Sequence, residues 1–159
     1  MIAKAATISH GGNAVRYSVN KDKAEIVKVN FLPDDISAEA MFQRMVLKQK
    51  EFSSIINKGR PLKRNVIRME ISPTKEESAG WTLADWVRLA NEYIRVFDSI
   101  DLSKKAKRAS AKFTNVKNSQ YVVALHHDAK SGIPHLHIDV NRVDMDGKVN
   151  DDHLIAERA

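Results

Sequence analysis

Apolar residues recur along the chain with two different periods, and these periods separate strands from helices. In five short segments apolar and polar residues alternate or form brief apolar runs, which is the pattern of a strand whose side chains point to opposite faces of a sheet. The sequence therefore predicts strands at residues 2–8, 25–32, 66–71, 120–126 and 136–143.

Two longer segments, residues 37–56 and 82–97, repeat apolar residues at spacings of three, four and seven, as an amphipathic helix does. Ser37 is placed to cap the first helix. Thr82 is placed to cap the second, with Asp85 three residues later as in a capping box. The sequence therefore predicts helices that alternate with the strands.

The last two predicted strands are joined by a turn sequence that contains Gly132 and Pro134. Such a connection favours an antiparallel hairpin and argues against a purely parallel sheet. The predicted fold class is α+β, with a mainly antiparallel sheet of about five strands and helices packed on it. Residues 150–159 begin with a helix cap and stop in helical sequence. We therefore expect one domain over residues 1–159, at the N-terminus of a longer protein.

Composition narrows the possible classes of protein. A hydrophobic content of 43% excludes a disordered chain. No run approaches the roughly 18 uncharged apolar residues of a membrane-spanning helix, and the apolar stretch at the N-terminus is too short for a secretory signal. We expect a soluble, cytoplasmic protein. The chain has no cysteine, so a metal ion would have to be held by His, Asp or Glu.

The charges are unevenly distributed. The net charge is +6, and the chain contains two basic blocks without acidic residues, at 58–68 and 104–117. A one-sided positive field suits a polyanionic partner such as nucleic acid. The alternative is that both blocks are ordinary solvated loops rich in lysine.

Four of the six histidines lie within residues 126–137. On a strand, His135 and His137 point to the same face, with Leu136 on the other. The end of the preceding strand supplies a third imidazole from His126 or His127, depending on the strand register. Three imidazoles with open coordination positions are typical of a catalytic metal centre, and Asp128 is placed to orient one of them. The alternative is a strand that carries two surface histidines.

The segment 121–148 resembles the metal-binding motif of relaxases, the mobilisation nucleases of the HUH endonuclease superfamily. The matching residues are His126-His127-Asp128, Pro134-His135-Leu136-His137, Asn141-Arg142-Val143 and Asp146-Gly147-Lys148. The resemblance implies the relaxase-type HUH fold and a bacterial protein. It also implies that His126, rather than His127, joins His135 and His137 as a metal ligand.

The stretch 11–25 resembles the region where relaxases of this type carry their catalytic tyrosine. Tyr17 is the only tyrosine in the first half of the chain, whereas Tyr93 lies on the apolar face of a predicted helix and Tyr121 begins a predicted core strand. The resemblance implies that Tyr17 attacks a phosphodiester of single-stranded DNA at an origin of transfer, which gives a covalent 5′-phosphotyrosine. The alternative is that Tyr17 is a packing residue.

Several further expectations follow from the resemblance. Tyrosine is a weak nucleophile at neutral pH, so a base is needed, and Glu70 and Asp128 are the candidates. The cofactor is expected to be a divalent metal ion, with Mn²⁺ or Mg²⁺ in use and Ni²⁺, Co²⁺ or Zn²⁺ able to occupy the site. DNA contacts are expected from the second basic block and its aromatic residue, namely Lys104, Lys105, Lys107, Arg108, Lys112 and Phe113.

The expected partners are single-stranded DNA, accessory mobilisation proteins and a coupling protein. Two other functions compete with this interpretation. One is a nucleic-acid-binding domain without catalytic activity, in which the histidines are structural. The other is a metallohydrolase that acts on a small substrate.

Overall fold

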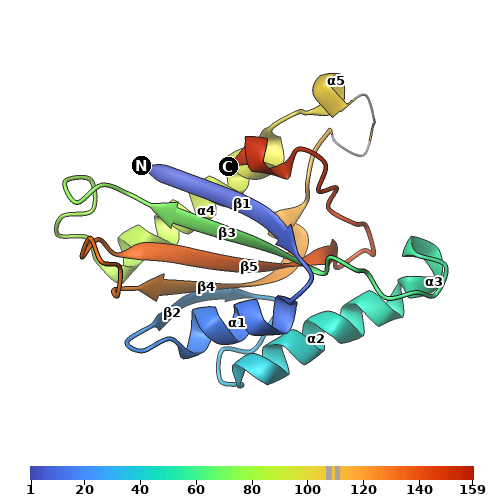
Figure 1. The fold of residues 1–159 in the computed structure, drawn as a ribbon, viewed down its shortest axis with the longest axis horizontal. Coiled ribbons are helices and arrows are strands. Elements are labelled where there is room, and N and C mark those ends of the chain that lie inside the picture. The colour runs from blue at the N-terminus through green and yellow to red at the C-terminus, as the bar shows by residue number, and fades with distance from the viewer. Residues whose placement is uncertain (107–108, 110–111) are drawn as a thin grey trace.

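A computed structural model covers residues 1–159 and describes all of them except 107–108 and 110–111 (Figure 1). Its centre is one sheet of five strands in the order β1-β3-β5-β4-β2, and every neighbouring pair is antiparallel. The strands are β1 (Ile2–Ile8), β2 (Glu25–Asn30), β3 (Val66–Ser72), β4 (Ser119–His126) and β5 (His135–Asp144). The α+β class and the antiparallel hairpin predicted from the sequence are confirmed.

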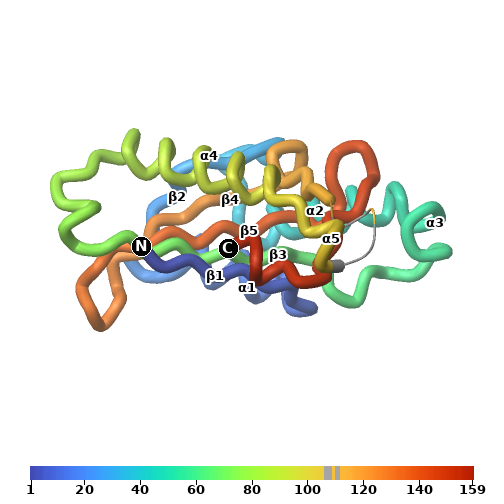
Figure 2. The backbone as a smooth tube through the Cα atoms, turned by 90° about the horizontal axis from the view of Figure 1, so that it is seen from above, coloured from blue at the N-terminus to red at the C-terminus, as the bar shows by residue number. Residues whose placement is uncertain are grey.

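One face of the sheet is covered by α4 (Leu83–Ser99), which lies across it in Figure 2. The predicted capping box is present at Thr82 and Asp85. The apolar side of α4, which includes Trp86 and Phe97, packs into the main core. It meets there the side chains that β3, β4 and β5 direct to this face, such as Met69, Leu125 and Leu136. Burial of this apolar surface is the main favourable contribution to folding.

The opposite face is only partly covered, by α1 (Gly11–Asn20) and α2 (Ala38–Glu51) (Figure 1). A second core lies there, where Val15 of α1 and Met41 and Met45 of α2 meet Val66 and Val122 of the sheet. The periodicity did not predict α1 as a helix. Its first two residues are glycines, which are poor helix formers, and its side chains provide no N-cap hydrogen bond.

The helix predicted over residues 37–56 is interrupted. Ser37 caps α2 as expected, by accepting a hydrogen bond from Ala40 N, but α2 ends at Glu51 and a separate turn, α3 (Ser53–Ile56), follows. The break at Phe52 lies where the chain after β5 passes. Gly147 has a φ of 86°, and a Cβ there would lie 2.4 Å from the Phe52 ring. The prediction of one continuous helix was therefore wrong.

The prediction of a helix after residue 150 was also wrong, because the Asn150 side chain does not cap a helix but binds the segment before β4. Its side chain accepts a hydrogen bond from Asn115 N and donates to Ser119 Oγ, and only a 3-10 turn forms, at Ile155–Arg158.

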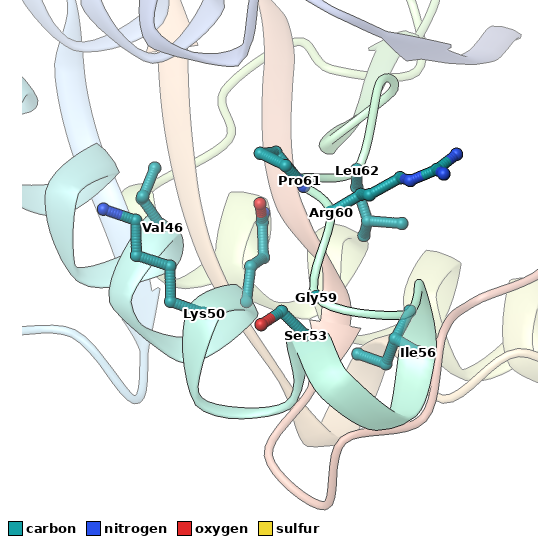
Figure 3. Close-up of a pocket in the computed structure, with 9 residues that line it drawn as sticks. Val46, Lys50, Ser53, Ile56, Gly59, Arg60, Pro61 and Leu62 are labelled. Carbon is teal, nitrogen blue, oxygen red and sulfur yellow. The ribbon is translucent and has the colours of Figure 1, made fainter.

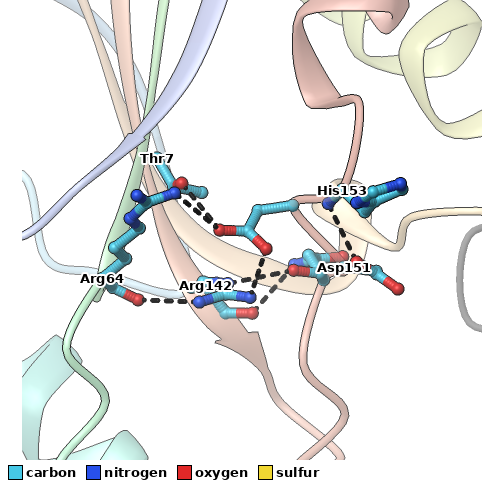
Figure 4. A network of polar contacts seen from close by, with 7 residues as sticks. Thr7, Arg64, Arg142, Asp151 and His153 are labelled. Atoms are coloured by element: carbon cyan, nitrogen blue, oxygen red, sulfur yellow. Dashed lines mark hydrogen bonds and ion pairs between the residues drawn. The ribbon is translucent and has the colours of Figure 1, made fainter.

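The segment around residue 152 is held instead by a polar network (Figure 4). Asp152 accepts hydrogen bonds from Thr7 Oγ1 and from Arg142, both at 2.9 Å, and lies 3.7 Å from Arg64. The network fastens the C-terminal segment to β1 and β5.

Two smaller helical segments complete the described chain. They are α5 (Ser103–Ala106) and a 3-10 turn at Val116–Asn118, directly before β4. Within the described residues, no helix has the length and apolar character required to cross a membrane.

The close approach of α1 to the sheet makes Gly11 a test of this arrangement. A Cβ on Gly11 would lie 2.5 Å from Val66 Cγ2 and 2.7 Å from Phe42 Cε2, whereas a Cβ on Gly12 would lie 3.1 Å from the Phe42 ring. We predict that Gly11→Ala lowers the free energy of unfolding by about 1–3 kcal/mol, as overpacking does. Urea unfolding measures this loss, with Gly12→Ala as the milder control. Equal stability of the two variants would contradict the close packing.

Candidate metal centre and nucleophile

The hairpin register brings three histidines together. His126 pairs directly with His135, and His137 lies two residues further along β5 on the same face. Each of the three offers a ring nitrogen, and these nitrogens lie within 4.8 Å of one another. The ring centroids of His126 and His137 are 4.1 Å apart, and those of His135 and His137 are 5.0 Å apart. This spacing allows three imidazoles to converge on one ion.

His127 does not join this cluster. It is exposed, and its Nε2 lies 3.2 Å from Glu25 Oε2. Successive residues leave β4 in opposite directions, so only one of the two histidines can face His135 and His137. Strand alternation alone left this choice open, the resemblance to relaxases implied His126, and the structure places His126 in the cluster.

The hydrogen bonds suit metal binding by His126. Its Nε2 lies 2.8 Å from the carbonyl oxygen of Ser18, and because a carbonyl only accepts, Nε2 carries the proton. The lone pair is therefore on Nδ1, which is buried and has no hydrogen-bond partner among the described residues. A partner that fixes the second ring nitrogen in this way is the usual arrangement for a metal-bound histidine.

His137 also fits a metal ligand. Both of its ring nitrogens are buried without a hydrogen-bond partner in the described part of the chain. Buried polar atoms are nearly always paired, so unpaired ring nitrogens within 4.8 Å of those of two other histidines fit the binding of an ion. Burial, reinforced by the neighbouring His126 and His135, lowers the pKa of His137 to about 3. Burial likewise lowers the pKa of His126. Both rings are therefore neutral at physiological pH, which is the form that binds metals.

Two carboxylates lie beside the imidazoles, and each is paired with a cation. Glu70 Oε1 is 3.7 Å from His137 Nδ1 and 3.0 Å from Arg68. Asp128 lies 3.9 Å from His126 Nδ1 and 3.2 Å from Lys21 Nζ. Its hydrogen bond with Lys21 lowers the pKa of Asp128. The two residues proposed as bases from the sequence are thus close to the cluster.

Tyr17 lies at the open side of the cluster. Its ring centroid is 5.5 Å from that of His126 and 5.6 Å from that of His137. Lys21 Nζ lies 5.0 Å from the ring centroid and Arg68 Cζ 5.4 Å from it. The residue is 42% exposed, so an incoming ligand can reach it. Tyr17 is therefore an accessible hydroxyl beside three imidazoles and two cations.

The other two tyrosines pack on the opposite face of the sheet. Tyr121 is 3% exposed in the main core, and Tyr93 packs partly buried against that core. Burial raises the pKa of Tyr93 to about 12, so its phenolate also forms less readily than that of a free tyrosine. Neither residue joins the histidine cluster.

Some neighbours of the cluster were not found by sequence reasoning. Ser18 acts through its backbone carbonyl, which leaves no trace in a sequence. Arg68 precedes Glu70 by two residues on an alternating strand, and that spacing was a usable signal for a shared face. Asp139 follows His137 by two residues and is fully buried, and burial raises its pKa to about 6.

The predicted DNA-binding residues lie elsewhere. Lys104 and Lys105 are on α5, while Lys112 and Phe113 are exposed before β4. They therefore lie toward the Ser119 end of β4, which is roughly 23 Å from His126 at about 3.3 Å per residue. Lys107 and Arg108 lie outside the described residues. The contact of this block with DNA stays a prediction.

The fold and the cluster together define a class of protein: an α+β domain in which three imidazoles and an exposed tyrosine meet on an antiparallel sheet. The family model described as Relaxase: MobA/VirD2-like, nuclease domain, matches residues 15–159. The chain therefore belongs to this relaxase family, whose domains nick DNA in mobilisation and act on single-stranded DNA. No curated protein and no solved structure matches the chain.

The geometry predicts that a divalent cation stabilises the folded domain. Ligands that bind only the folded state add about 2.7 kcal/mol at one hundred times their dissociation constant. We expect Mn²⁺, Ni²⁺, Co²⁺ or Zn²⁺ to raise the thermal midpoint of the wild type, with reversal by EDTA. His137→Ala should lose the shift, whereas His127→Ala, outside the cluster, should keep it. An equal shift in both variants would show that the ion binds somewhere else.

Proposed function

We propose that this domain cleaves one DNA strand at an origin of transfer through attack by the Tyr17 hydroxyl and becomes covalently attached to the 5′ end. One observation carries the proposal: the exposed Tyr17 ring lies 5.5–5.6 Å from the rings of His126 and His137. Family membership supplies the substrate class, because relaxase nuclease domains act on single-stranded DNA.

The proposed reaction is a transesterification. The Tyr17 Oη–phosphorus bond forms as the bond from phosphorus to the 3′ oxygen breaks. The phenol proton passes to a base, and the departing oxygen takes up a proton and becomes a free 3′-hydroxyl. Because one phosphodiester replaces another, the energy of the bond is retained. A 3′-hydroxyl can therefore attack the phosphotyrosine later and rejoin the strand without ATP.

His126, His135 and His137 would hold the divalent cation that relaxases typically use. Three imidazoles favour Mn²⁺, Co²⁺, Ni²⁺ or Zn²⁺ in affinity, while Mg²⁺ prefers oxygen ligands but is abundant enough to be the ion in use. When bound, such an ion neutralises charge on the non-bridging phosphate oxygens. The unpaired nitrogens of His126 and His137 fit this role.

Lys21 and Arg68 supply positive charge next to the nucleophile. Their cationic groups lie 5.0 and 5.4 Å from the centre of the Tyr17 ring. A phosphate brought to Tyr17 would therefore meet both cations, and hydrogen bonds from charged donors to phosphate are strong. We assign these two residues to binding and orienting the scissile phosphate.

Glu70 and Asp128 are the proposed acceptors of the Tyr17 proton. Glu70 also lies 3.7 Å from His137 Nδ1, which suits a second role, the orientation of that ring. Asp128 lies nearest to His126 Nδ1, which carries the lone pair, so Asp128 has no N–H there to accept from. The two roles predict different losses when the carboxylate is removed.

The decisive measurement is the covalent adduct. The wild type is incubated with Mn²⁺ and a supercoiled plasmid that carries the origin of transfer recognised by this protein, and the reaction is stopped with detergent. We expect nicked DNA with the protein attached to its 5′ end. Tyr17→Phe should abolish the adduct because it removes the attacking oxygen. Tyr93→Phe, a change of the same chemistry in the core, should retain it.

Other outcomes separate the competing functions. Nicking without an attached protein would indicate an ordinary metal-dependent nuclease. DNA binding without any nicking would indicate a binding domain. An adduct that persists in Tyr17→Phe would exclude Tyr17 as the nucleophile.

Glu70→Gln and Asp128→Asn distinguish proton acceptance from histidine orientation. Loss of a proton acceptor is expected to slow adduct formation by about 10²–10⁴-fold with metal affinity unchanged. Loss of an orienting carboxylate is expected to weaken metal binding by about 10–100-fold. Single-turnover rates at saturating Mn²⁺, together with Mn²⁺ titrations, measure the two effects. Neither residue has a role in the site if both quantities stay at the wild-type level.

A further inference from the structure

Apart from Arg68, the basic block at residues 58–68 has no part in the proposed reaction, yet it borders a pocket. We propose that this pocket, between α2, α3 and the loop before β3, receives one base of the bound DNA strand while Lys50 and Arg60 contact the neighbouring phosphates. The proposal rests on the proposed function, because it assigns a second contact to the same DNA strand.

The pocket has the size and lining for a planar ring. Its volume is about 160 Å³. An apolar cavity of roughly 150 Å³ is known to hold one benzene molecule, so this space suits a single base. The apolar wall is formed by side chains of α2, α3 and the following loop, namely Val46, Ile56, Pro61 and Leu62 (Figure 3).

Two polar groups in the pocket are free to bind the edge of a base. Gln49 Nε2 donates to Asn65 O at 3.0 Å and to Asn141 Oδ1 at 2.8 Å, which fixes the orientation of the amide. Within the described part of the chain, Gln49 Oε1 and the Ser53 hydroxyl have no hydrogen-bond partner. A fixed acceptor beside a hydroxyl can meet the amino and imino groups of a base.

The charges around the pocket are complementary to a nucleic-acid strand. Lys50 and Arg60 extend on opposite sides of the pocket in Figure 3, and Lys58 and Lys63 are exposed on the same loop. These four cations form no ion pair with any described residue. The adjacent acid, Glu51, is paired with Lys48 at 2.8 Å. Single-strand binding surfaces combine cations that contact phosphates with side chains against which bases pack, usually aromatic ones. Here free cations flank a pocket whose packing surface is aliphatic.

Hydrogen bonds within the chain fix the wall of the pocket in the absence of a ligand. Asn57 N and Gly59 N both donate to Ser53 O, and Asn57 Nδ2 donates to Pro61 O at 3.1 Å. Lys58 and Gly59 have positive φ angles of 51° and 81°, which turn the loop back over α3. A preformed wall lowers the entropy lost on binding.

The pocket lies away from the cleavage centre. Its loop leads into Val66, which pairs with Asn141, whereas Glu70 pairs with His137 four residues further along β3. At about 3.3 Å per residue, the two places are separated by at least roughly 13 Å. A strand that spans them is held at two points, and the second contact fixes which phosphate reaches Tyr17.

The test compares oligothymidylate with an abasic oligomer of equal length, so that the phosphates are the same and only the bases differ. We expect Ser53→Leu, which fills the pocket, to reduce the preference for oligothymidylate about tenfold, as loss of one base contact does. Ser54→Leu, next to it but outside the pocket, is the control. Lys50→Ala combined with Arg60→Ala should weaken binding of both oligomers and lower the salt slope by about 0.7 per lost phosphate contact.

Arg88→Ala combined with Arg95→Ala changes the charge equally on α4 and should bind like the wild type. Should Ser53→Leu fail to fold, crosslinking of 5-iodouracil DNA to the wild type replaces it, with the crosslink expected within residues 46–62. Wild-type binding in all pocket variants, or crosslinks only elsewhere, would overturn the proposal.

Adduct formation on the origin plasmid is measured with the same preparations. If the wild type forms the adduct and the pocket variants bind normally, only the pocket proposal fails. If the pocket variants lose binding but the wild type forms no adduct, only the proposed reaction fails.

Discussion

The register of the β4–β5 hairpin is the constraint on which the rest of the site depends. Pairing of His126 with His135 sends three imidazoles to one face and Leu125 and Leu136 to the other, where they enter the core under α4. A slip of β4 by one residue would turn Leu125 out of the core and bring His127, in place of His126, to the face that carries His135 and His137. The free energy of burying apolar side chains on one face of the sheet thus decides which imidazoles meet on the other. The packing of the core thereby determines which histidines can act as metal ligands.

The second half of the site depends on how α1 is fastened to that hairpin. The Ser18 carbonyl accepts the Nε2 proton of His126, a contact between residues 108 positions apart in the chain. Tyr17 precedes Ser18, so one turn of helix both fixes the tautomer of a ligand and presents an exposed hydroxyl to it. The glycine at residue 11 lets this helix approach Val66 closely enough for the contact to form. The nucleophile and the metal ligands are therefore positioned by the same packing.

Sequence periodicity predicted what depends on local alternation, and it failed where tertiary contacts decide. All five strands and α4 follow from apolar spacing and a capping box, and the shared face of His135 and His137 on one strand follows from alternation alone. The helix α1 begins with glycines and has no cap, so only its burial against α2 and the sheet explains it. Periodicity could not choose between His126 and His127 without the register, although the resemblance to relaxases implied His126. The break at Phe52 required knowledge that Gly147 lies against it.

The positive charges likewise fall into two groups: those that cluster in the sequence and those that only the fold brings to the site. Basic blocks are easy to see in a sequence, yet of the two cations beside Tyr17 one, Lys21, lies outside both blocks and the other, Arg68, is the last residue of the first block. Each is paired with an acid. The other residues of the first block precede β3 or lie at its start, away from Tyr17, and the second block precedes β4. A cation at a reacting centre must be fixed, and ion pairing with a nearby carboxylate fixes it. Cations that bind a strand along its length need only be numerous and free. Clustering in sequence therefore indicates the surfaces that hold a polyanion, whereas only the fold shows the charges that act on one phosphate.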